Sequence, residues 1–380
     1  MSKKIAFIGY GLRSEFMMNA FKEIEADITV SAIADPDFEN IKAKLAGDPL
    51  FENTIYYKDG ITMLDEAEMD GVFIGTRCSL HTDLACEVLK RGLPLFLEKP
   101  VCINMEQYLR LREAGTGMED KVVVSFPLRL TAIVDRMKSI VDSGELGQLS
   151  MVQAVNNANY GSVYYHSWYR DPKETGGLFL QKTTHDIDYI RYLIGEAPSS
   201  VFAHREKTYF KGNHRAGLHC PDCEEYRSCI ESSYVVEKIL KEDLQGDACC
   251  FAVDTGNEDA ASAMFMCESG VIISYNQNFI VKRSAARRGC RIIGTRGCAE
   301  FDFNSGKVRL DSYDVAESAV FDLSTSGNHF GGDQRLAQEF MKVLDGKKSG
   351  SGLKDGLISA ACCLAATRSA DENLPVAIEY

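Results

Sequence analysis

Short apolar runs of β-forming residues recur in the first third of the chain, and each is followed by a stretch whose apolar positions have helical spacing. Three such units are KKIAFIGYGLRSEFMMNAFKEI (3–24), DGVFIGTRCSLHTDLACEVLKRG (70–92) and LPLFLEKPVCINMEQYLRLREAG (93–115). Strands and helices that alternate along a chain join by right-handed crossovers into a parallel sheet with helices on both faces. The pattern therefore predicts an α/β domain with a doubly wound parallel sheet, a Rossmann domain, over residues 1–127.

After residue 127 the pattern changes, because the apolar runs suit strands and fewer helical stretches separate them. Examples are GQLSMVQAVNNANY (147–160), ASAMFMCESGVIISYNQNFI (261–280) and GCRIIGTRGCAEFDF (289–303). A second, strand-rich domain is therefore predicted over residues 128–380. A helix at about 353–369, rich in alanine and cysteine, is expected to pack back on the first domain.

The composition is that of an ordinary globular protein, with 45% hydrophobic and 26% charged residues in a chain of 380,. Its formal net charge of −13 would repel a polyanion, so nucleic acid is not expected as a partner,. No apolar run approaches the roughly 18 residues that a membrane span requires. Without a secretory segment, the 13 cysteines are expected to be reduced thiols, and the protein to be soluble and cytoplasmic,.

A dinucleotide-binding turn is predicted where the first strand meets its helix, at Gly9-Tyr10-Gly11. Gly9 permits the turn, and Gly11 lets a pyrophosphate approach the N–H groups at the helix N-terminus. Ser14 stands where the fingerprint expects a third glycine. Asp35, at the end of the second strand, can accept both hydroxyls of the adenosine ribose, which favours NAD,. Arg13 could instead bind a 2′-phosphate, so NADP remains an alternative.

Two further stretches, GTRCSLH (75–81) and Glu98-Lys99-Pro100, follow the next apolar runs. Because the carboxyl ends of parallel strands meet at one edge of a sheet, both are expected beside the glycine turn, with Lys99 placed to hydrogen-bond an oxygen of a substrate lying on the cofactor. The residues expected at the cofactor are Gly9, Gly11, Leu12, Arg13, Asp35, Thr76, His81, Glu98 and Lys99.

GGLFLQKTTHDIDYIRYLIG (176–195) changes from an apolar, glycine-led run into a stretch that carries Lys182, His185 and two aspartates. As a helix it has an apolar stripe of isoleucines on one side, and Gln181 and His185 lie one turn apart. Taken alone, this stretch fits a solvated face with one structural histidine.

The cysteine-rich segment at about 213–232 interrupts the strand pattern. Cys220, Cys223 and Cys229, together with His219 or His214, have a spacing that can surround a structural zinc ion,. The alternative is a set of reduced thiols that pack an insertion loop.

AFIGYG, AIADPD, GTRCSLHTDLACEVLKRG, LEKP, GELGQL and the 176–195 stretch together resemble the glucose–fructose oxidoreductase, inositol dehydrogenase and MocA (Gfo/Idh/MocA) family of NAD(P)-dependent oxidoreductases. The resemblance implies an α+β second domain with a large open, mostly antiparallel sheet. It also implies a homodimer or homotetramer formed through that sheet, and a carbohydrate or polyol substrate held between the domains.

The resemblance assigns Lys99 to bind and polarise the reacting oxygen and His185 to act as general acid or base. Many relatives have an aspartate four residues before this histidine, where this chain has Gln181, followed by Lys182. That departure leaves two alternatives beside a sugar or inositol dehydrogenase acting on CH–OH groups. One is a redox-assisted NAD-dependent glycoside hydrolase or lyase, and the other is a non-catalytic dinucleotide-binding regulator.

Four further residues are candidates for substrate contact beside Gln181. Tyr160 and Trp168 could line or stack on a sugar ring, although aromatic residues next to a turn commonly serve packing. His329 precedes Gly331-Gly332-Asp333, a stretch that is also typical of a capped helix start,. Lys182 next to His185 would lower the pKa of the imidazole if both face the substrate.

Overall fold

A computed structural model describes residues 2–316, 318–323 and 328–380, and the chain divides into two compact units. The first unit contains residues 1–134, residues 325–361 and Tyr380, and the second contains residues 135–324 and 362–379. The segment 325–361, which the sequence pattern assigned to the second domain, therefore belongs to the first unit.

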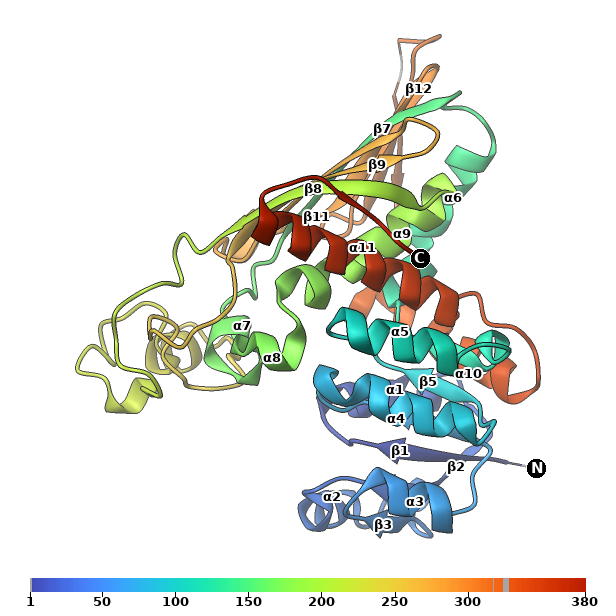
Figure 1. Cartoon of the computed structure of the whole chain (residues 1–380), viewed down its shortest axis with the longest axis vertical. Helices are drawn as coiled ribbons and strands as arrows, with labels where there is room; N and C mark the ends of the chain where they lie inside the picture. Colours follow the sequence, from blue (N-terminus) through green and yellow to red (C-terminus); the bar gives the residue numbers. More distant parts are fainter. Residues whose placement is uncertain (1, 317, 324–327) are drawn as a thin grey trace. The chain divides into compact units, whose positions relative to one another are not determined.

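The first unit is built on a six-stranded parallel sheet with the order β3-β2-β1-β4-β5-β6. The strand order reverses at β1, as in a doubly wound dinucleotide-binding sheet, and this confirms the predicted fold class. The strands, drawn blue to cyan in Figure 1, are β1 (Lys3–Ile8), β2 (Ile28–Ala34), β3 (Ile55–Tyr57), β4 (Gly71–Ile74), β5 (Leu95–Leu97) and β6 (Val122–Val124). Their helices are α1 (Leu12–Glu23), α2 (Phe38–Leu45), α3 (Gly60–Glu66), α4 (His81–Lys90), α5 (Met105–Ala114) and α10 (Gly332–Leu344).

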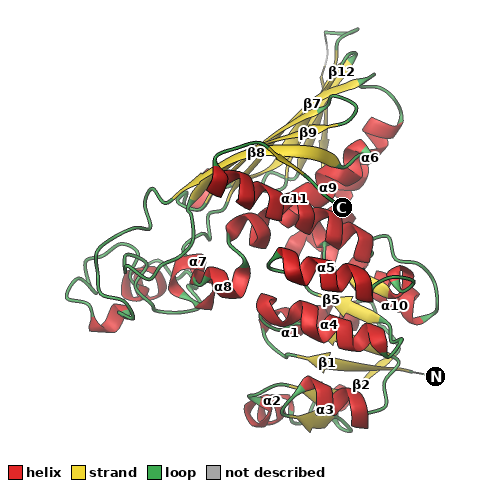
Figure 2. Cartoon of the chain, viewed as in Figure 1, coloured by secondary structure: helices red, strands yellow, loops and turns green. Residues whose placement is uncertain are grey.

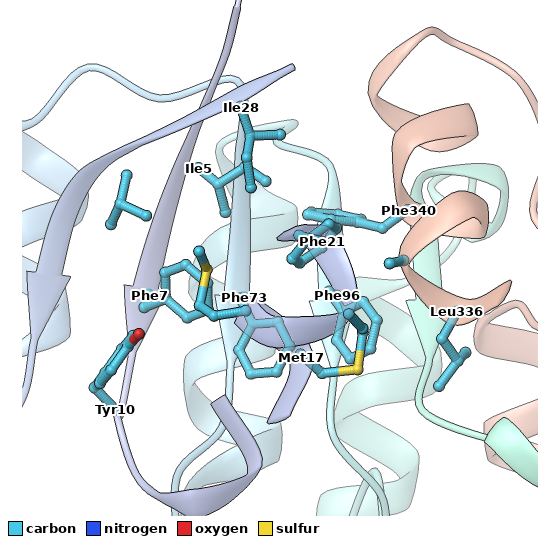
Figure 3. Close-up of a cluster of buried hydrophobic side chains, with 14 of the residues drawn as sticks. Ile5, Phe7, Tyr10, Met17, Phe21, Ile28, Phe73, Phe96, Leu336 and Phe340 are labelled. Atoms are coloured by element: carbon cyan, nitrogen blue, oxygen red, sulfur yellow. The ribbon is translucent and has the colours of Figure 1, made fainter. Parts of the chain in front are cut away.

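Three phenylalanines from neighbouring strands form the centre of the first unit's core (Figure 3). The ring centroids of Phe7 and Phe73 lie 5.0 Å apart, and Phe73 stacks on Phe96 at 4.6 Å. Phe340 of α10 meets Phe96 edge-on at 5.6 Å and also packs on Phe21 of α1. Because burying one such side chain contributes about 1.5–3 kcal/mol, this contact explains why α10 joins the first unit.

The second unit is built on a nine-stranded sheet with the order β14-β13-β12-β11-β7-β10-β9-β8-β15. All neighbours are antiparallel except β7 and β10, which confirms the expected open, mostly antiparallel sheet. Figure 1 labels several of its strands, which are β7 (Leu149–Asn157), β8 (Pro198–Glu206), β9 (Ala260–Cys267), β10 (Ile272–Asn278), β11 (Arg287–Gly294), β12 (Gly297–Asp302), β13 (Lys307–Ser312), β14 (Ser318–Asp322) and β15 (Val376–Ala377).

Helix α9 packs on this sheet against β7. The helices outside the Rossmann core are α6 (Ala132–Asp142), α7 (Val163–His166), α8 (Pro172–Thr175), α9 (Thr184–Ile194) and α11 (Leu353–Glu372). Residues 353–361 of α11 belong to the first unit and the rest of that helix to the second. Among the described residues, no helix is both long enough and apolar enough to cross a membrane.

Burial alternates along β9, with Ala261, Ala263, Phe265 and Cys267 inside. The opposite face keeps Met264 exposed, and it lies across the strand pair from the exposed Phe202 of β8. This period-two burial is typical of a sheet that is covered on one face. Most of the chain between β8 and β9 is loop (Figure 2), and this stretch contains the cysteine-rich segment.

Candidate functional site

The glycine turn of the first unit joins the ends of three structural elements. Gly9 has φ +81°, and a Cβ built there would lie 2.9 Å from the carbonyl carbon of Gly75 after β4. The hydroxyl of Ser14, which is fully buried in α1, donates to the carbonyl oxygen of Gly9 at 2.8 Å. A side chain at Gly9 would therefore be excluded by its conformation and by its neighbours.

The residues around this turn fit the pyrophosphate of a dinucleotide. Helix α1 begins at Leu12, directly after Gly11, and no side chain caps it. A Cβ built on Gly11 would meet nothing within 4 Å, so the space in front of the helix is open. Helix N-terminal N–H groups and the positive end of the helix dipole then face a region that an anion can enter.

Asp35 lies at the end of β2 beside the same turn. One carboxylate oxygen accepts from the backbone N–H of Tyr10 at 2.9 Å, and the other accepts from that of Asp37 at 2.8 Å. These bonds hold the half-buried carboxylate in place next to the glycine turn. This is the position from which an acidic side chain accepts the hydroxyls of an adenosine ribose.

Arg13 has partners that lie far away in the sequence. Its guanidinium binds Glu98 at 2.7 Å and Asp333 of α10 through two bonds of 3.0 and 2.7 Å, and it also reaches Ser125 at 3.1 Å. Burial lowers the pKa of Arg13, but the charges and hydrogen bonds of Glu98 and Asp333 together raise it by more than burial lowers it, so the net shift is upward and the group stays charged. The structure gives this guanidinium two carboxylates as partners rather than leaving it open for a 2′-phosphate.

His329 belongs to the same network in the first unit. Its Nδ1 lies 3.0 Å from Asp333, and both His329 and Phe330 adopt left-handed backbone angles, with φ of 47° and 54°. Non-glycine residues in this region are strained, and such strain gathers at functional positions. The histidine side chain is one-third exposed.

His81 positions the stretch that contains Lys99. The buried imidazole lies 2.8 Å from the carbonyl oxygen of Pro100 and 3.2 Å from that of Thr76, so it bridges the segments after β4 and β5. Six of the nine residues expected at the cofactor lie directly after β1, β2, β4 or β5 or in the turns that follow: Gly9, Gly11, Asp35, Thr76, Glu98 and Lys99. The other three, Leu12, Arg13 and His81, lie in the first turns of α1 and α4.

In the second unit, the polar stretch that precedes α9 is anchored at both ends. Glu258 accepts from the backbone N–H groups of Leu178 and Phe179 at 3.1 Å each, where the chain enters a π-helical turn over Phe179–Thr183. Thr183 donates its hydroxyl to Gln277 of β10 at 3.0 Å. These bonds, together with the apolar side of α9, bury Gln181, Lys182 and His185.

Asp186, one residue after His185, is fully buried and accepts from three adjacent strands. Arg288 of β11 donates through Nε at 2.8 Å, Asn156 of β7 through Nδ2 at 2.9 Å, and Tyr275 of β10 through its hydroxyl at 2.8 Å. Local sequence patterns do not predict this network, because the partners of Asp186 lie 30 to 102 residues away. The only local signal was the acidic HDID sequence.

Lys182 is 92% buried, with a relative exposure of 8%. Its ammonium lies 4.6 Å from the centre of the Tyr164 ring and 4.9 Å from that of Tyr160, and it reaches the Tyr160 hydroxyl at 3.4 Å. Burial lowers the pKa of Lys182 to about 7; the charge of Arg288 lowers it too, while Asp186 raises it. A strongly shifted titratable group is a functional candidate.

The aromatic candidates form one row beside Lys182. Trp168 stacks on Tyr169 with 3.9 Å between centroids, Tyr169 meets Tyr164 at 5.3 Å, and Tyr164 meets Tyr160 at 6.3 Å. The structure thus brings Tyr160, Trp168 and Lys182 together. It places His329 in the other unit's network.

The expected zinc site is not supported. His219 turns its exposed ring to Asp247 at 2.8 Å, whereas Cys249, which the sequence analysis did not include, lies 3.4 Å from His214. Throughout the described ranges, no group of three or more His, Cys, Asp or Glu side chains could hold a metal ion. Cys220, Cys223 and Cys229 are free thiols lining a recess.

The parallel sheet with its glycine turn, joined to a second unit with an open sheet, defines a dinucleotide-binding oxidoreductase. Residues 3–126 match the oxidoreductase family with the NAD-binding Rossmann fold, and residues 134–300 match the Gfo/Idh/MocA C-terminal domain. The chain belongs to the Gfo/Idh/MocA family, and its first unit contains an NAD-binding domain.

One relative and two solved structures match nearly the whole chain, and a second relative matches a part of it. The Bacillus subtilis oxidoreductase YteT is 23% identical over 99% of this chain and 98% of its own, and inositol 2-dehydrogenase 2 of Saccharopolyspora erythraea is 28% identical over 60% and 63%. Levoglucosan dehydrogenase, solved with NADH and levoglucosan, has a TM-score of 0.78 at 18% identity, with full coverage of both chains. A Kribbella flavida oxidoreductase domain protein has a TM-score of 0.79 at 16% identity, also with full coverage. At these identities the structures show that the fold is shared.

Proposed function

We propose that this enzyme transfers a hydride between nicotinamide and a hydroxyl or carbonyl carbon of a sugar, an inositol or a derivative of one. The observation that supports it best is the buried polar stretch of the second unit, where an amine, an amide and an imidazole lie within five residues. Burying such groups costs free energy, and titratable groups that burial perturbs gather at functional sites, so in an oxidoreductase of this family they are candidates for substrate binding and proton transfer.

Lys99 is proposed to hydrogen-bond and polarise the reacting oxygen, and His185 to take up or return the hydroxyl proton. When bound, the nicotinamide supplies the hydride acceptor or donor, so the chain has to orient the substrate and manage one proton. Gly9, Gly11, Leu12, Asp35, Thr76 and Glu98 are proposed to hold or shape the dinucleotide site, with His81 positioning the Lys99 segment.

NAD is proposed as the cofactor in preference to NADP. Asp35 is held beside the glycine turn, where its charge would repel a 2′-phosphate. Arg13, the nearest candidate cation, is bound to Glu98 and Asp333.

The proposal is tested by following absorbance at 340 nm with NAD and a panel of inositols, aldoses, anhydrosugars and their acids. We expect NADH formation with a subset of the panel. Lys99→Ala and His185→Ala should abolish turnover while the affinity for NAD, measured by fluorescence titration, stays within about threefold. Lys173→Ala and His204→Ala, at exposed positions of the second unit, serve as matched controls. Near-normal rates in either site variant would remove that residue from the mechanism.

A redox-assisted glycoside hydrolase or lyase is the second candidate, and Gln181 favours it. A neutral amide cannot take a proton or stabilise an imidazolium ion as a carboxylate in that position would. This activity would release an aryl group from aryl glycosides without net NADH. NAD binding without either reaction would favour a regulator.

We also propose that the outer face of the β8–β9 pair contributes to a homodimer or homotetramer. Phe202 and Met264 lie opposite each other there, 39% and 47% exposed. Light scattering coupled to gel filtration measures the assembly directly, and a monomer at micromolar concentration would contradict the proposal.

A further inference from the structure

Lys182 is a buried cation without an anionic partner. Within the part of the chain that the structure describes, no carboxylate forms an ion pair with its ammonium, whose one polar contact is the Tyr160 hydroxyl at 3.4 Å. Asp186, the acidic group in electrostatic range, is already occupied by Arg288, Asn156 and Tyr275. A buried charge is ordinarily paired, so the missing partner is the feature to explain.

A second cationic side chain in electrostatic range of Lys182 has a buried nitrogen atom without a hydrogen-bond partner. Arg288 uses Nε to bind Asp186, but its Nη2 atom is buried and has no hydrogen-bond partner among the described residues. The charges of Arg288 and Lys182 are close enough for Arg288 to lower the pKa of the lysine. Buried donors are nearly always bonded. An unbonded guanidinium nitrogen in electrostatic range of an ammonium whose one polar contact is a 3.4 Å bond to a phenol therefore indicates a missing acceptor.

The groups around the Lys182 ammonium leave it accessible from solvent beside Tyr160, and their charges indicate the charge of the ligand. Tyr160 covers the ammonium and is itself 46% exposed, so the site adjoins solvent there. Because the charge of Arg288 is offset by Asp186, the set carries at most one net positive charge, supplied by Lys182. One positive charge matches a monoanion better than a phosphate dianion.

We propose that Lys182, the Nη2 group of Arg288 and the Tyr160 hydroxyl form a subsite for a carboxylate group of the substrate, which is therefore a sugar acid. The inference rests on the proposed function for its sugar part, but the subsite itself is a binding property. Guanidinium and ammonium groups are the usual donors to a carboxylate, and charge-assisted bonds are the strongest of the available hydrogen bonds.

The adjacent aromatic row fits the rest of such a ligand. Tyr164, Tyr169 and Trp168 extend from Lys182 in a continuous series of ring contacts. A sugar ring presents C–H groups to aromatic faces, so a sugar acid could bind both features at once. The Gln181 amide, adjacent in sequence, is a further donor and acceptor for hydroxyl groups.

Calorimetric titration of the NAD-loaded protein tests the subsite with matched ligand pairs: galacturonate against galactose, glucuronate against glucose, and glucose 6-phosphate. We expect each uronate to bind at least about tenfold more tightly than its neutral sugar. Lys182→Met should remove that preference, whereas Lys173→Met, at an exposed lysine of the same unit, should keep it. Equal binding of acid and neutral sugar, preference for the phosphate, or an unchanged preference in Lys182→Met would each overturn the proposal.

Proton uptake gives a readout independent of turnover. Near pH 7 Lys182 is partly neutral, because its pKa is lowered to about 7. The titratable and charged groups that face it are Tyr160, Tyr164, Arg288 and Asp186. A carboxylate that binds Lys182 should therefore draw in about half a proton per site, seen as a dependence of the heat on the buffer's ionisation enthalpy. Lys182→Met should show none of this uptake. Uronate binding without any NADH formation would support the carboxylate subsite and contradict the proposed function. NADH formation from neutral sugars alone would support the proposed function and contradict the subsite.

Discussion

The buried ammonium of Lys182 should make the protein less stable near neutral pH than a variant without it. Its pKa falls from 10.5 to about 7 on folding, chiefly because burial disfavours the charged form. The unfolded chain therefore binds more protons than the folded protein between pH 7 and pH 10.5, and in this window the contribution to stability rises with pH. From these two values, the penalty at pH 6 exceeds that at pH 9 by roughly 2–3 kcal/mol.

The perturbation is Lys182→Met, which keeps most of the side-chain volume and removes the charge. Other groups titrate over the same range, so the quantity to measure is the difference in unfolding free energy between the variant and the wild type. We expect urea unfolding to show that Lys182→Met is the more stable protein at pH 6, and that its advantage shrinks by roughly 2–3 kcal/mol at pH 9. The measurement uses apo-protein without sugar acids, because a bound anion would offset the charge.

A constant difference between pH 6 and pH 9, or a variant that is less stable than the wild type at pH 6, would refute the reasoning. Either result would mean that the lysine is charged and paired in the folded protein. Lys173→Met provides the baseline, since an exposed lysine has no such penalty and its curve should run parallel to that of the wild type.

Two further predictions concern the first unit. Gly9→Ala should destabilise the protein by more than about 1 kcal/mol and weaken NAD binding, because the new Cβ would meet the Gly75 backbone at 2.9 Å in a left-handed conformation,. Gly270→Ala is the control, since Gly270 also has a positive φ but lies in open space, so its loss of stability measures the backbone conformation alone. Equal losses of stability in both variants would contradict the steric argument. Asp333→Ala should lower the unfolding free energy by about 3–5 kcal/mol, because it removes one of the two carboxylates that pair with the buried Arg13,. Asp345→Ala, at a surface ion pair, should change the unfolding free energy by less than about 1 kcal/mol,. Similar effects of the two substitutions in thermal or urea unfolding would contradict the role of the network.

Local sequence patterns were sufficient to predict the first strand, turn and helix, and the order of the elements was sufficient to predict the parallel sheet. Residues 3–24 contain a complete strand, turn and helix, and Ser14 fits because a hydroxyl can both pack closely and bond to Gly9. The expectation that Asp35 and Lys99 follow strands of one parallel sheet also needed only the order of the elements.

Contacts between distant segments could not be predicted in this way. Arg13 looks like an exposed cofactor ligand in its local sequence, and only the fold reveals partners 85 and 320 residues away. Asp186 and Arg288 meet because β11 lies next to β7, a pairing with no local signature. The spacing of cysteines does not say where their side chains point, so the sequence could not decide between a zinc site and packed reduced thiols, and the described residues support no metal site.

The contribution of α10 to the first unit has a consequence for biosynthesis. The aromatic face formed by Phe21 and Phe96 receives Phe340 only after more than two hundred intervening residues have been made. Chains fold largely in the order in which they leave the ribosome, so a nascent NAD-binding unit has an uncovered apolar surface until late in translation. During that interval the unit lacks α10, the segment that covers this surface in the complete chain. A fragment ending at residue 134 would keep that exposed surface permanently.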